Sequence, residues 1–232
     1  MRRLAALLSI VCLLSGCART VVGDAHSAAS ALTILPTGEE MSSAVGNRLS
    51  TFGFQPFIGG VEILPDGYRS DAEAAPISCA AVTDTAPRIV YEKLPVLEAA
   101  RQSYFNWDQG VNTSGADAAV VRLGSADAAR RVFDSFARQW QQCSGTTVVK
   151  HVGDTMIDAD ITDVSVQGLT VAATVRTHQH PSAPHSRYER ALGVRESTVV
   201  EVSLAITPAG EREPDPRAAA VRVAELMLDR SQ

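Results

Sequence analysis

Residues 116–145 read ADAAVVRLGSADAARRVFDSFARQWQQCSG, and this stretch decides the fold. The mostly apolar run over residues 116–123 predicts a strand, and Gly124 separates it from a helix that begins after the N-cap residue Ser125. In that helix the apolar side chains recur at helical spacing, at Ala129, Val132, Phe133, Phe136 and Trp140. Because a helix with one apolar face packs against another element, the stretch predicts a strand–helix unit built into a hydrophobic core.

The first residues of the chain resemble an export signal. Met1-Arg2-Arg3 is followed by a mostly apolar run over residues 4–14 and by Ser15-Gly16-Cys17. A basic start, a short apolar segment and small residues before a processing site are typical of a secretory signal, and the apolar run is too short to span a bilayer as a helix. With Cys17 directly after Ser15-Gly16, the segment resembles a bacterial lipobox. We therefore predict a signal peptide at residues 1–16 and a lipid (palmitate) anchor at Cys17, which holds the chain on the extracytoplasmic face of the cell membrane.

The composition is that of a globular protein with one sizeable domain. Hydrophobic residues make up 45% and charged residues 20% of the 232-residue chain. The formal net charge is −5, and about −7 once Arg2 and Arg3 leave with the signal. Nucleic-acid-binding proteins need clustered Lys and Arg, so the acidic balance argues against that class. It also argues against electrostatic adhesion to anionic lipid, which leaves membrane attachment to the lipid anchor.

Two cysteines remain in the expected mature domain, because Cys12 leaves with the signal and Cys17 carries lipid. In an oxidising extracytoplasmic space, two leftover thiols in one domain are expected to pair. Cys143 lies three residues after Trp140 on the same helix face, so its sulfur is expected to point into the core, where Cys79 could meet it. We predict a Cys79–Cys143 disulfide; two buried free thiols are the alternative.

The chain divides into three parts. After the signal, residues 17–31 are small and polar without useful periodicity, and we interpret them as the lipidated cysteine and a flexible tether. Residues 32–232 then form a single domain.

The N-terminal third of this domain contains two helix signals. Thr37 and Glu40 have the spacing of a capping box and predict a short helix. Residues 51–69, which are rich in Gly, Pro and aromatic residues, predict an ordered loop or short strands. A second helix, around Cys79, is expected to start at or after Pro76.

Beyond the central helix the hydrophobic period changes to two. Apolar and polar residues alternate in three segments, each predicting a half-buried antiparallel strand: 157–162, 169–176 and 200–206. Gln167-Gly168 predicts a tight turn, and residues 177–192 a longer polar loop. Asp215-Pro216 predicts the start of a last helix with an apolar stripe. Helices that flank consecutive antiparallel strands predict an α+β fold, with one sheet and helices against it.

The order of these elements resembles a known family. With Cys79 near an early helix and RQWQQCS at residues 138–144 ending the central one, the chain resembles the PknH-like extracytoplasmic sensor domain, which mycobacterial kinases and free-standing lipoproteins carry. The resemblance covers roughly residues 32–230 and is most specific over residues 118–144. It implies a twisted antiparallel sheet and a cleft that binds an unidentified ligand. Kinase members have a second disulfide that this chain lacks, so the loops which that bridge would hold are expected to be looser.

Four residues are candidates for lining such a cleft. Tyr104 and Trp107 lie in a stretch that mixes aromatic and hydrogen-bonding side chains, as binding surfaces do. Arg138 and Trp140 come from the segment that carries the family resemblance. Ordinary partial burial of the first pair and core packing of Trp140 are the alternatives.

Neither a metal site nor a catalytic site is predicted. His178 and His180 could share a metal from one face of a strand, with His185 five residues on, but no third ligand stands at fixed spacing. The aspartates at 154, 158, 160 and 163 lack the spacing and the glycine of an EF-hand. We interpret both groups as solvated. The sequence contains no nucleophile elbow, HExxH motif or phosphate loop. We therefore expect no cofactor and no catalytic residue.

These observations predict a lipid-anchored, non-enzymatic sensor-like domain that binds a small molecule or envelope component in a cleft. The chain has no kinase domain, so any signal would have to pass to another membrane protein. Nucleic acid is not an expected partner. Two other classes stay open: an accessory or scaffolding envelope lipoprotein that binds another protein, and an envelope hydrolase.

Overall fold

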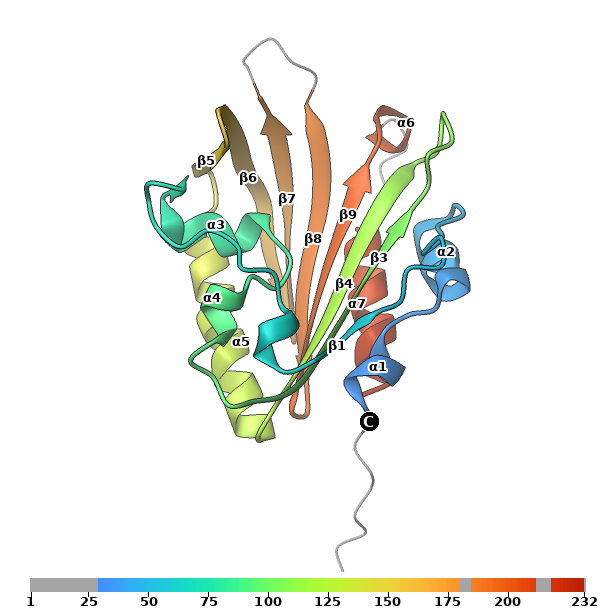
Figure 1. Ribbon diagram of the computed structural model, residues 1–232, viewed down its shortest axis with the longest axis vertical. Coiled ribbons are helices and arrows are strands. Elements are labelled where there is room, and N and C mark those ends of the chain that lie inside the picture. The colour runs from blue at the N-terminus through green and yellow to red at the C-terminus, as the bar shows by residue number, and fades with distance from the viewer. Residues whose placement is uncertain (1–28, 180–184, 212–217, 232) are drawn as a thin grey trace, which may run out of the picture.

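The computed structural model describes residues 29–179, 185–211 and 218–231. At its centre is an open, nine-stranded antiparallel sheet with β1 and β2 at its edges (Figure 1). The strands pair in the order β1-β3-β4-β9-β8-β7-β6-β5-β2. Their bounds are β1 Phe57–Gly59, β2 Ala74–Ala75, β3 Val96–Phe105, β4 Thr113–Leu123, β5 Thr147–Val152, β6 Thr155–Gln167, β7 Thr170–His178, β8 Ser186–Arg195 and β9 Thr198–Ile206.

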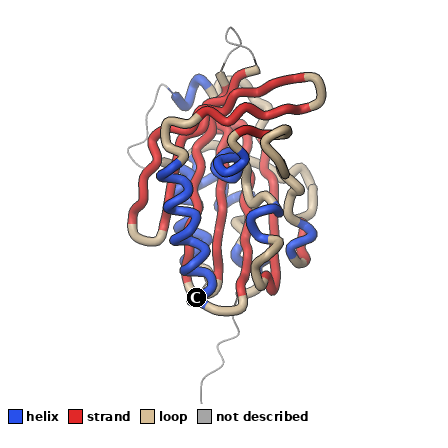
Figure 2. The backbone as a smooth tube through the Cα atoms, turned by 90° about the vertical axis from the view of Figure 1, so that its left-hand side faces the viewer, coloured by secondary structure: helices blue, strands red, loops and turns tan. Residues whose placement is uncertain are grey.

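Helices cover both faces of this sheet, and each face has its own hydrophobic core. The helices are α1 Ala31–Ile34, α2 Gly38–Val45, α3 Ile77–Thr83, α4 Arg88–Tyr91, α5 Ala126–Gln142, α6 Pro208–Glu211 and α7 Ala219–Asp229, with a 3-10 turn η1 at Val61–Ile63. One core joins α3, α4 and α5 to the sheet, and the other joins α1, α2 and α7 to the opposite face. Figure 2 shows the strands along the long axis with helices packed beside them. The expected α+β fold, a twisted antiparallel sheet with flanking helices, is confirmed.

The strand–helix unit at residues 116–145 is confirmed as β4 followed by α5. Ser125 is the N-cap of α5, and its hydroxyl accepts a hydrogen bond from Ala128 N at 3.2 Å. The apolar side chains predicted for the buried face of α5 lie in the core that it shares with the sheet. The capping box at Thr37 and Glu40 is also confirmed at the start of α2.

The Cys79–Cys143 disulfide is confirmed. Cys79 lies in α3, which starts directly after Pro76 as predicted, and Cys143 is the C-cap of α5. Both cysteines are almost fully buried. The bond therefore fixes α3 to the end of α5 on one side of the sheet.

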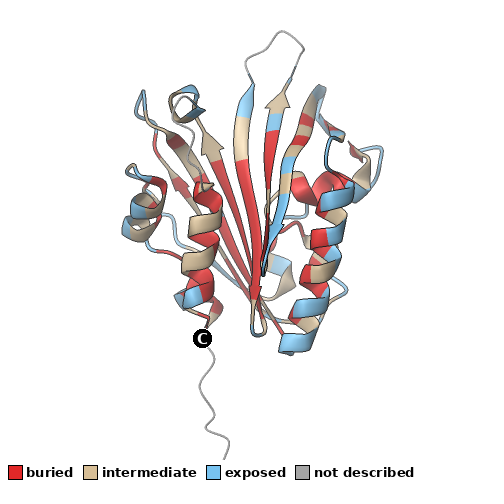
Figure 3. Cartoon of the chain, turned by 180° about the vertical axis from the view of Figure 1, so that it is seen from behind, coloured by how far each residue is buried: buried red, intermediate tan, exposed pale blue. Residues whose placement is uncertain are grey.

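The prediction of a polar loop at residues 177–192 was wrong, because β8 occupies Ser186–Arg195 between β7 and β9. Residues 189–194 of β8 are buried despite two charged side chains among them. Likewise β9, expected to be half-buried, is buried on both faces, including Glu201 and Ser203. Helices on both faces of the sheet cause this burial, and Figure 3 shows it as a red centre.

The start of the described chain differs from the expectation by one residue. Ala31, which the sequence placed at the end of the tether, begins α1 and is fully buried. The predicted anchor at Cys17 and the predicted helix start at Asp215-Pro216 lie outside the described residues. In the described part of the chain, none of the helices combines the length and the apolar character needed to cross a membrane.

Candidate functional site

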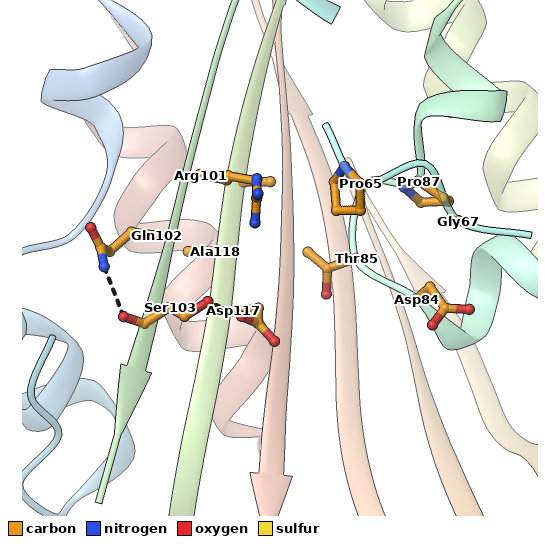
Figure 4. Close-up of a pocket in the computed structure, with 11 residues that line it drawn as sticks. Pro65, Gly67, Asp84, Thr85, Pro87, Arg101, Gln102, Ser103, Asp117 and Ala118 are labelled. Carbon is orange, nitrogen blue, oxygen red and sulfur yellow. Dashed lines mark hydrogen bonds between the residues drawn. The ribbon is translucent and has the colours of Figure 1, made fainter. Parts of the chain in front are cut away.

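A cleft lies between strands β3 and β4 and the loops that cross above them (Figure 4). The loops contribute residues 65–67, which follow η1, and residues 84–87, which join α3 to α4. The cavity between loops and strands has a volume of about 200 Å³. It is lined by Pro65, Gly67, Asp84, Thr85, Pro87, Arg101, Gln102, Ser103, Asp117, Ala118 and Ala119.

The floor of the cleft carries a cation and an anion on one face of the sheet. Arg101 and Ser103 alternate on β3, and Ser103 pairs with Asp117 across β4, so the three side chains project to the same side. Ser103 Oγ donates to Asp117 Oδ1 at 2.5 Å. Arg101 Nε donates to the carbonyl of Ile63 at 2.8 Å, and its guanidinium lies 4.0 Å from the ring centroid of Phe57. These contacts orient the two charged groups of the floor.

The roof of the cleft is fixed by ionic contacts to the sheet. Lys150 Nζ on β5 donates to both carboxylate oxygens of Asp84, at 2.9 and 2.8 Å. Thr85 Oγ1 accepts a hydrogen bond from Arg190 Nη1 at 2.6 Å. The backbone of Arg88 donates to the carbonyl of Pro65 at 2.6 Å, which joins the two roof loops to each other.

Beneath the roof lies a fully buried ion pair. Arg190 Nη2 on β8 is 3.0 Å from Glu201 Oε2 on β9, and the two side chains are 0% and 3% exposed. Arg190 also donates to the carbonyls of Val82 and Asp84, at 3.0 and 2.7 Å, while Glu201 accepts from the Ala86 backbone at 2.9 Å. A buried charge is tolerated only when paired and hydrogen-bonded, and here the loop backbone supplies the remaining partners. The loop is therefore held by the same contacts that satisfy the charges.

Tyr91 completes this network. Its hydroxyl donates to Glu201 Oε1 at 2.5 Å, and the side chain is fully buried in α4. Burial raises the pKa of the Tyr91 phenol well above its usual value, and the neighbouring Glu201 carboxylate raises it further. The phenol therefore stays protonated and keeps donating to the carboxylate.

A second cavity of about 240 Å³ adjoins the cleft on the far side of the roof. Asp84 and Pro87 line both cavities, and the second is otherwise walled mainly by side chains of α3 and α4. Tyr68 lies at this cavity, where burial and then the nearby Asp84 raise the pKa of its phenol. Apolar surface predominates in the lining of both cavities, and the polar share is larger in the cleft.

The four cleft candidates predicted from sequence do not come together. Tyr104 and Trp140 are each 1% exposed and lie in the separate cores on opposite faces of the sheet. Arg138 is exposed on α5. Trp107, which is 72% exposed, lies beyond the end of β3. Trp140 packs in the core, which was the alternative interpretation, and its ring centroid lies 5.6 Å from the Arg190 guanidinium.

The residues that do line the cleft floor gave a weaker signal in the sequence. Asp117 is one of two charged residues, with Arg122, in a mostly apolar strand, and Arg101 and Ser103 alternate in a segment that we did not predict as a strand. A carboxylate on a strand that is otherwise buried is the one feature that could have identified this floor. That this carboxylate marks the floor of a cleft follows only from the pairing of β3 with β4, which cannot be read from the sequence.

The histidine group does not form a metal site in the described residues. His178 Nε2 is 3.4 Å from Asp158 Oδ2, and its ring centroid is 4.8 Å from that of His185. His180 lies outside the described residues. The described part of the chain contains no cluster of three or more His, Cys, Asp or Glu side chains that could hold a metal ion.

Comparison with known proteins identifies the family. The sequence-family model of the PknH-like extracellular domain matches residues 26–230 of this chain. The chain is similar to the crystal structure of the extracellular domain of PknH from Mycobacterium tuberculosis, with a TM-score of 0.66, 16% identity, and coverage of 87% of this chain and 98% of the other. A hypothetical protein from Helicobacter pylori matches with a TM-score of only 0.27 at 9% identity, over 50% of this chain and 86% of the other. None of the curated proteins matches. From its match to the family model, the chain belongs to the PknH-like extracellular domain family.

Proposed function

We propose that this protein is a lipid-anchored extracytoplasmic sensor domain that binds a small polar molecule, or the polar end of an envelope component, in the cleft between β3, β4 and the roof loops. It carries out no catalysis. Binding changes how the domain contacts a membrane protein partner, which passes the signal on.

The observation that carries this proposal is the arrangement of Arg101 and Asp117 under a fixed roof. Both charged groups are oriented by contacts to neighbouring residues, and the roof loop is held by Lys150 and by the Arg190–Glu201 pair. A site whose walls are already ordered loses little conformational entropy when a ligand binds. Concave sites with a few convergent polar groups are the usual form of a small-molecule site.

The size and charge of the cleft define the ligand class. Its volume of about 200 Å³ is below the roughly 300–1,000 Å³ typical of sites for drug-sized molecules, so the ligand is small or enters with one end. Arg101 offers hydrogen-bond donors and positive charge, and Asp117 offers acceptors and negative charge. These groups fit a zwitterionic or polyhydroxylated ligand better than an apolar one.

The test is native mass spectrometry on residues 18–232 after exposure to an envelope extract from the host. We expect a reproducible adduct with the wild-type chain and its loss in Arg101→Gln. Arg138→Gln, which removes the same charge from the exposed face of α5, is the matched control and should keep the adduct. A clean mass in all three chains, or an adduct that Arg101→Gln retains, contradicts the cleft proposal.

The lipid anchor is tested separately. Replacing Cys17 with Ala should release the protein from membranes, because the acyl chains are then missing. Fractionation and detergent partitioning measure this release. An unchanged membrane fraction would refute Cys17 as the site of attachment.

A further inference from the structure

Four aromatic side chains form a patch near the β1 edge of the sheet, outside both cores; three of them are exposed and Phe105 is half-buried. They come from residues 52–54, between α2 and β1, and from residues 105–107 at the end of β3. We call this the aromatic patch: Phe52, Phe54, Phe105 and Trp107. Trp107 is 72% and Phe54 63% exposed. Single exposed apolar side chains are common, but exposed apolar side chains that gather in one patch mark an interaction surface.

The rings of the patch pack on one another. Phe52 stacks on Trp107 with centroids 4.2 Å apart and planes 12° apart, and Phe105 lies 6.3 Å from Trp107. Phe54 meets Phe105 edge-on at 6.4 Å. The backbones of Ser50 and Phe105 exchange two hydrogen bonds, at 2.9 and 2.8 Å, which fix the loop to the strand. The patch is therefore a preformed surface, held in place by its own contacts.

We propose that the aromatic patch lies against the surface of the lipid bilayer to which the chain is anchored, and so fixes how the domain faces the membrane. The inference rests on the proposed anchor at Cys17. The number of residues in the tether makes the contact possible. Twelve residue steps separate Cys17 from Ala29, the first described residue, and span up to about 40 Å when extended.

The first described residues lie beside β3, the strand that ends at Phe105 of the patch. The backbone of Ala31 donates to Glu98 Oε2 on β3 at 3.0 Å. Phe105 lies seven residues further along β3, which is about 23 Å at the usual strand rise. A fully extended tether would be longer than this distance, so lipid at Cys17 and the aromatic patch can reach the same bilayer surface.

The chemistry of the patch fits lipid. Trp is enriched at the membrane interface, and Trp and Phe are typical of surfaces that enter the boundary between headgroups and acyl chains. Arg48 and Asp108 border Phe52 and Trp107 around one small cavity, at the place where headgroups would lie. The acidic chain gains little from anionic lipid, so apolar contact has to supply the attraction. An anchored domain stays close to the bilayer, and a patch of this size is then enough to orient it.

The patch adjoins the cleft. Arg101, on the cleft floor, lies four residues before Phe105 on β3, which is about 13 Å at the usual strand rise. A domain that rests on this patch holds its cleft close to the membrane surface.

The chain contains a built-in probe for this contact. It has two tryptophans, of which Trp140 is 1% and Trp107 is 72% exposed, so changes in surface fluorescence report on Trp107. Residues 18–232 with an N-terminal histidine tag are attached to phosphatidylethanolamine–phosphatidylglycerol vesicles that contain a nickel-chelating lipid. This artificial anchor makes the result independent of lipidation at Cys17. Circular dichroism and the intact disulfide control for folding.

We expect the emission of the attached chain to shift to shorter wavelength, its quenching by iodide to fall, and brominated lipids to quench it. Phe54→Ser should lose most of the shift. Met156→Ser is the matched control and should keep it, because Met156 is 57% exposed but lies on β6, towards the opposite edge of the sheet. Asp117→Asn, which changes the cleft floor at a side chain whose hydrogen bond is to Ser103, should also keep it, and this separates the membrane contact from ligand binding in the cleft.

Three results would overturn the proposal. The first is a Trp107 emission and an iodide quenching that do not change on attachment. The second is an equal shift in Phe54→Ser and wild type. The third is a shift that follows protein concentration without vesicles, together with a dimer in sedimentation that Phe54→Ser abolishes, since a second copy of the chain would then cover the patch.

Discussion

The guanidinium of Arg190 on β8 lies 3.0 Å from the carboxylate of Glu201 on β9, and neither side chain is more than 3% exposed. The two strands are neighbours in the middle of the sheet. Both charges also bind the backbone of the loop that forms the roof of the cleft. The pair therefore links the centre of the fold to the wall of the candidate site.

Removing one member of this pair should be strongly destabilising. Glu201→Leu leaves the Arg190 charge buried without its partner, and we expect a loss of about 3–5 kcal/mol in the free energy of unfolding. The double variant Arg190→Met/Glu201→Leu should lose less, because no charge is then left buried. Urea denaturation measures both.

The exposed pair Arg195–Asp229, at 2.9 Å, is the matched control for that experiment. Arg195→Met should change the free energy of unfolding by less than about 1 kcal/mol, because water screens exposed charges. If Glu201→Leu costs no more than Arg195→Met, the buried pair does not stabilise the fold as we infer.

The disulfide should contribute a comparable amount. Cys79 and Cys143 are separated by 64 residues, and a loop of this length is worth roughly 4 kcal/mol in the chain-entropy model. The double variant Cys79→Ala/Cys143→Ala should lose about that much in equilibrium unfolding. Reduction of the wild-type protein should give the same result. A loss below about 1 kcal/mol would mean that the unfolded chain is not restricted by this bond.

A segment of the fold could be predicted where its signal is local, and could not where its structure depends on residues far away in the sequence. The unit around Ser125 and the capping box at Thr37 were predictable because their signals are local. The strand β8 was not, because Glu189 and Arg190 resemble loop residues until the partner of each is known. Arg190 is satisfied by Glu201 and by a loop more than a hundred residues away in sequence. Charged residues that pair over long range cannot be recognised in one segment.

The candidate site followed the same pattern. Aromatic residues near a polar stretch suggested a cleft, but Tyr104 and Trp140 pack in the cores, since large rings are the side chains that gain most from burial. The cleft floor consists instead of Arg101, Ser103 and Asp117, which become one surface only when β3 pairs with β4. The disulfide was predictable because only two cysteines were left to pair.

Stability should fall at alkaline pH because of Tyr91. Its pKa is raised in the folded state by burial and by Glu201, from a usual value of 10.0. In the unfolded chain the phenol loses its proton above that value while the folded chain keeps it, so its contribution is complete below about pH 10 and declines above it, by up to about 1.4 kcal/mol per pH unit.

The comparison of wild type with Tyr91→Phe isolates this effect. At about pH 8 the variant reports only the lost hydrogen bond to Glu201, roughly 1–3 kcal/mol. Between about pH 10 and about pH 11 its free energy of unfolding should fall less steeply than that of the wild type, as measured by urea denaturation at each pH. Parallel slopes for the two proteins would show that Tyr91 ionises equally in both states.

The ion pair between Lys150 and Asp84 should respond unequally to the loss of its two members. The Lys150 side chain is 8% exposed and that of Asp84 is 34% exposed. Asp84→Asn leaves a buried ammonium without its carboxylate and should cost about 1–3 kcal/mol, whereas Lys150→Met leaves a carboxylate that water still reaches and should cost less. Because Asp84 lines both cavities, Asp84→Asn should also loosen the roof and weaken any adduct seen by mass spectrometry. Thermal unfolding of the two variants side by side gives the order, and a larger loss in Lys150→Met would show that Asp84, not Lys150, is the charge that depends on this contact.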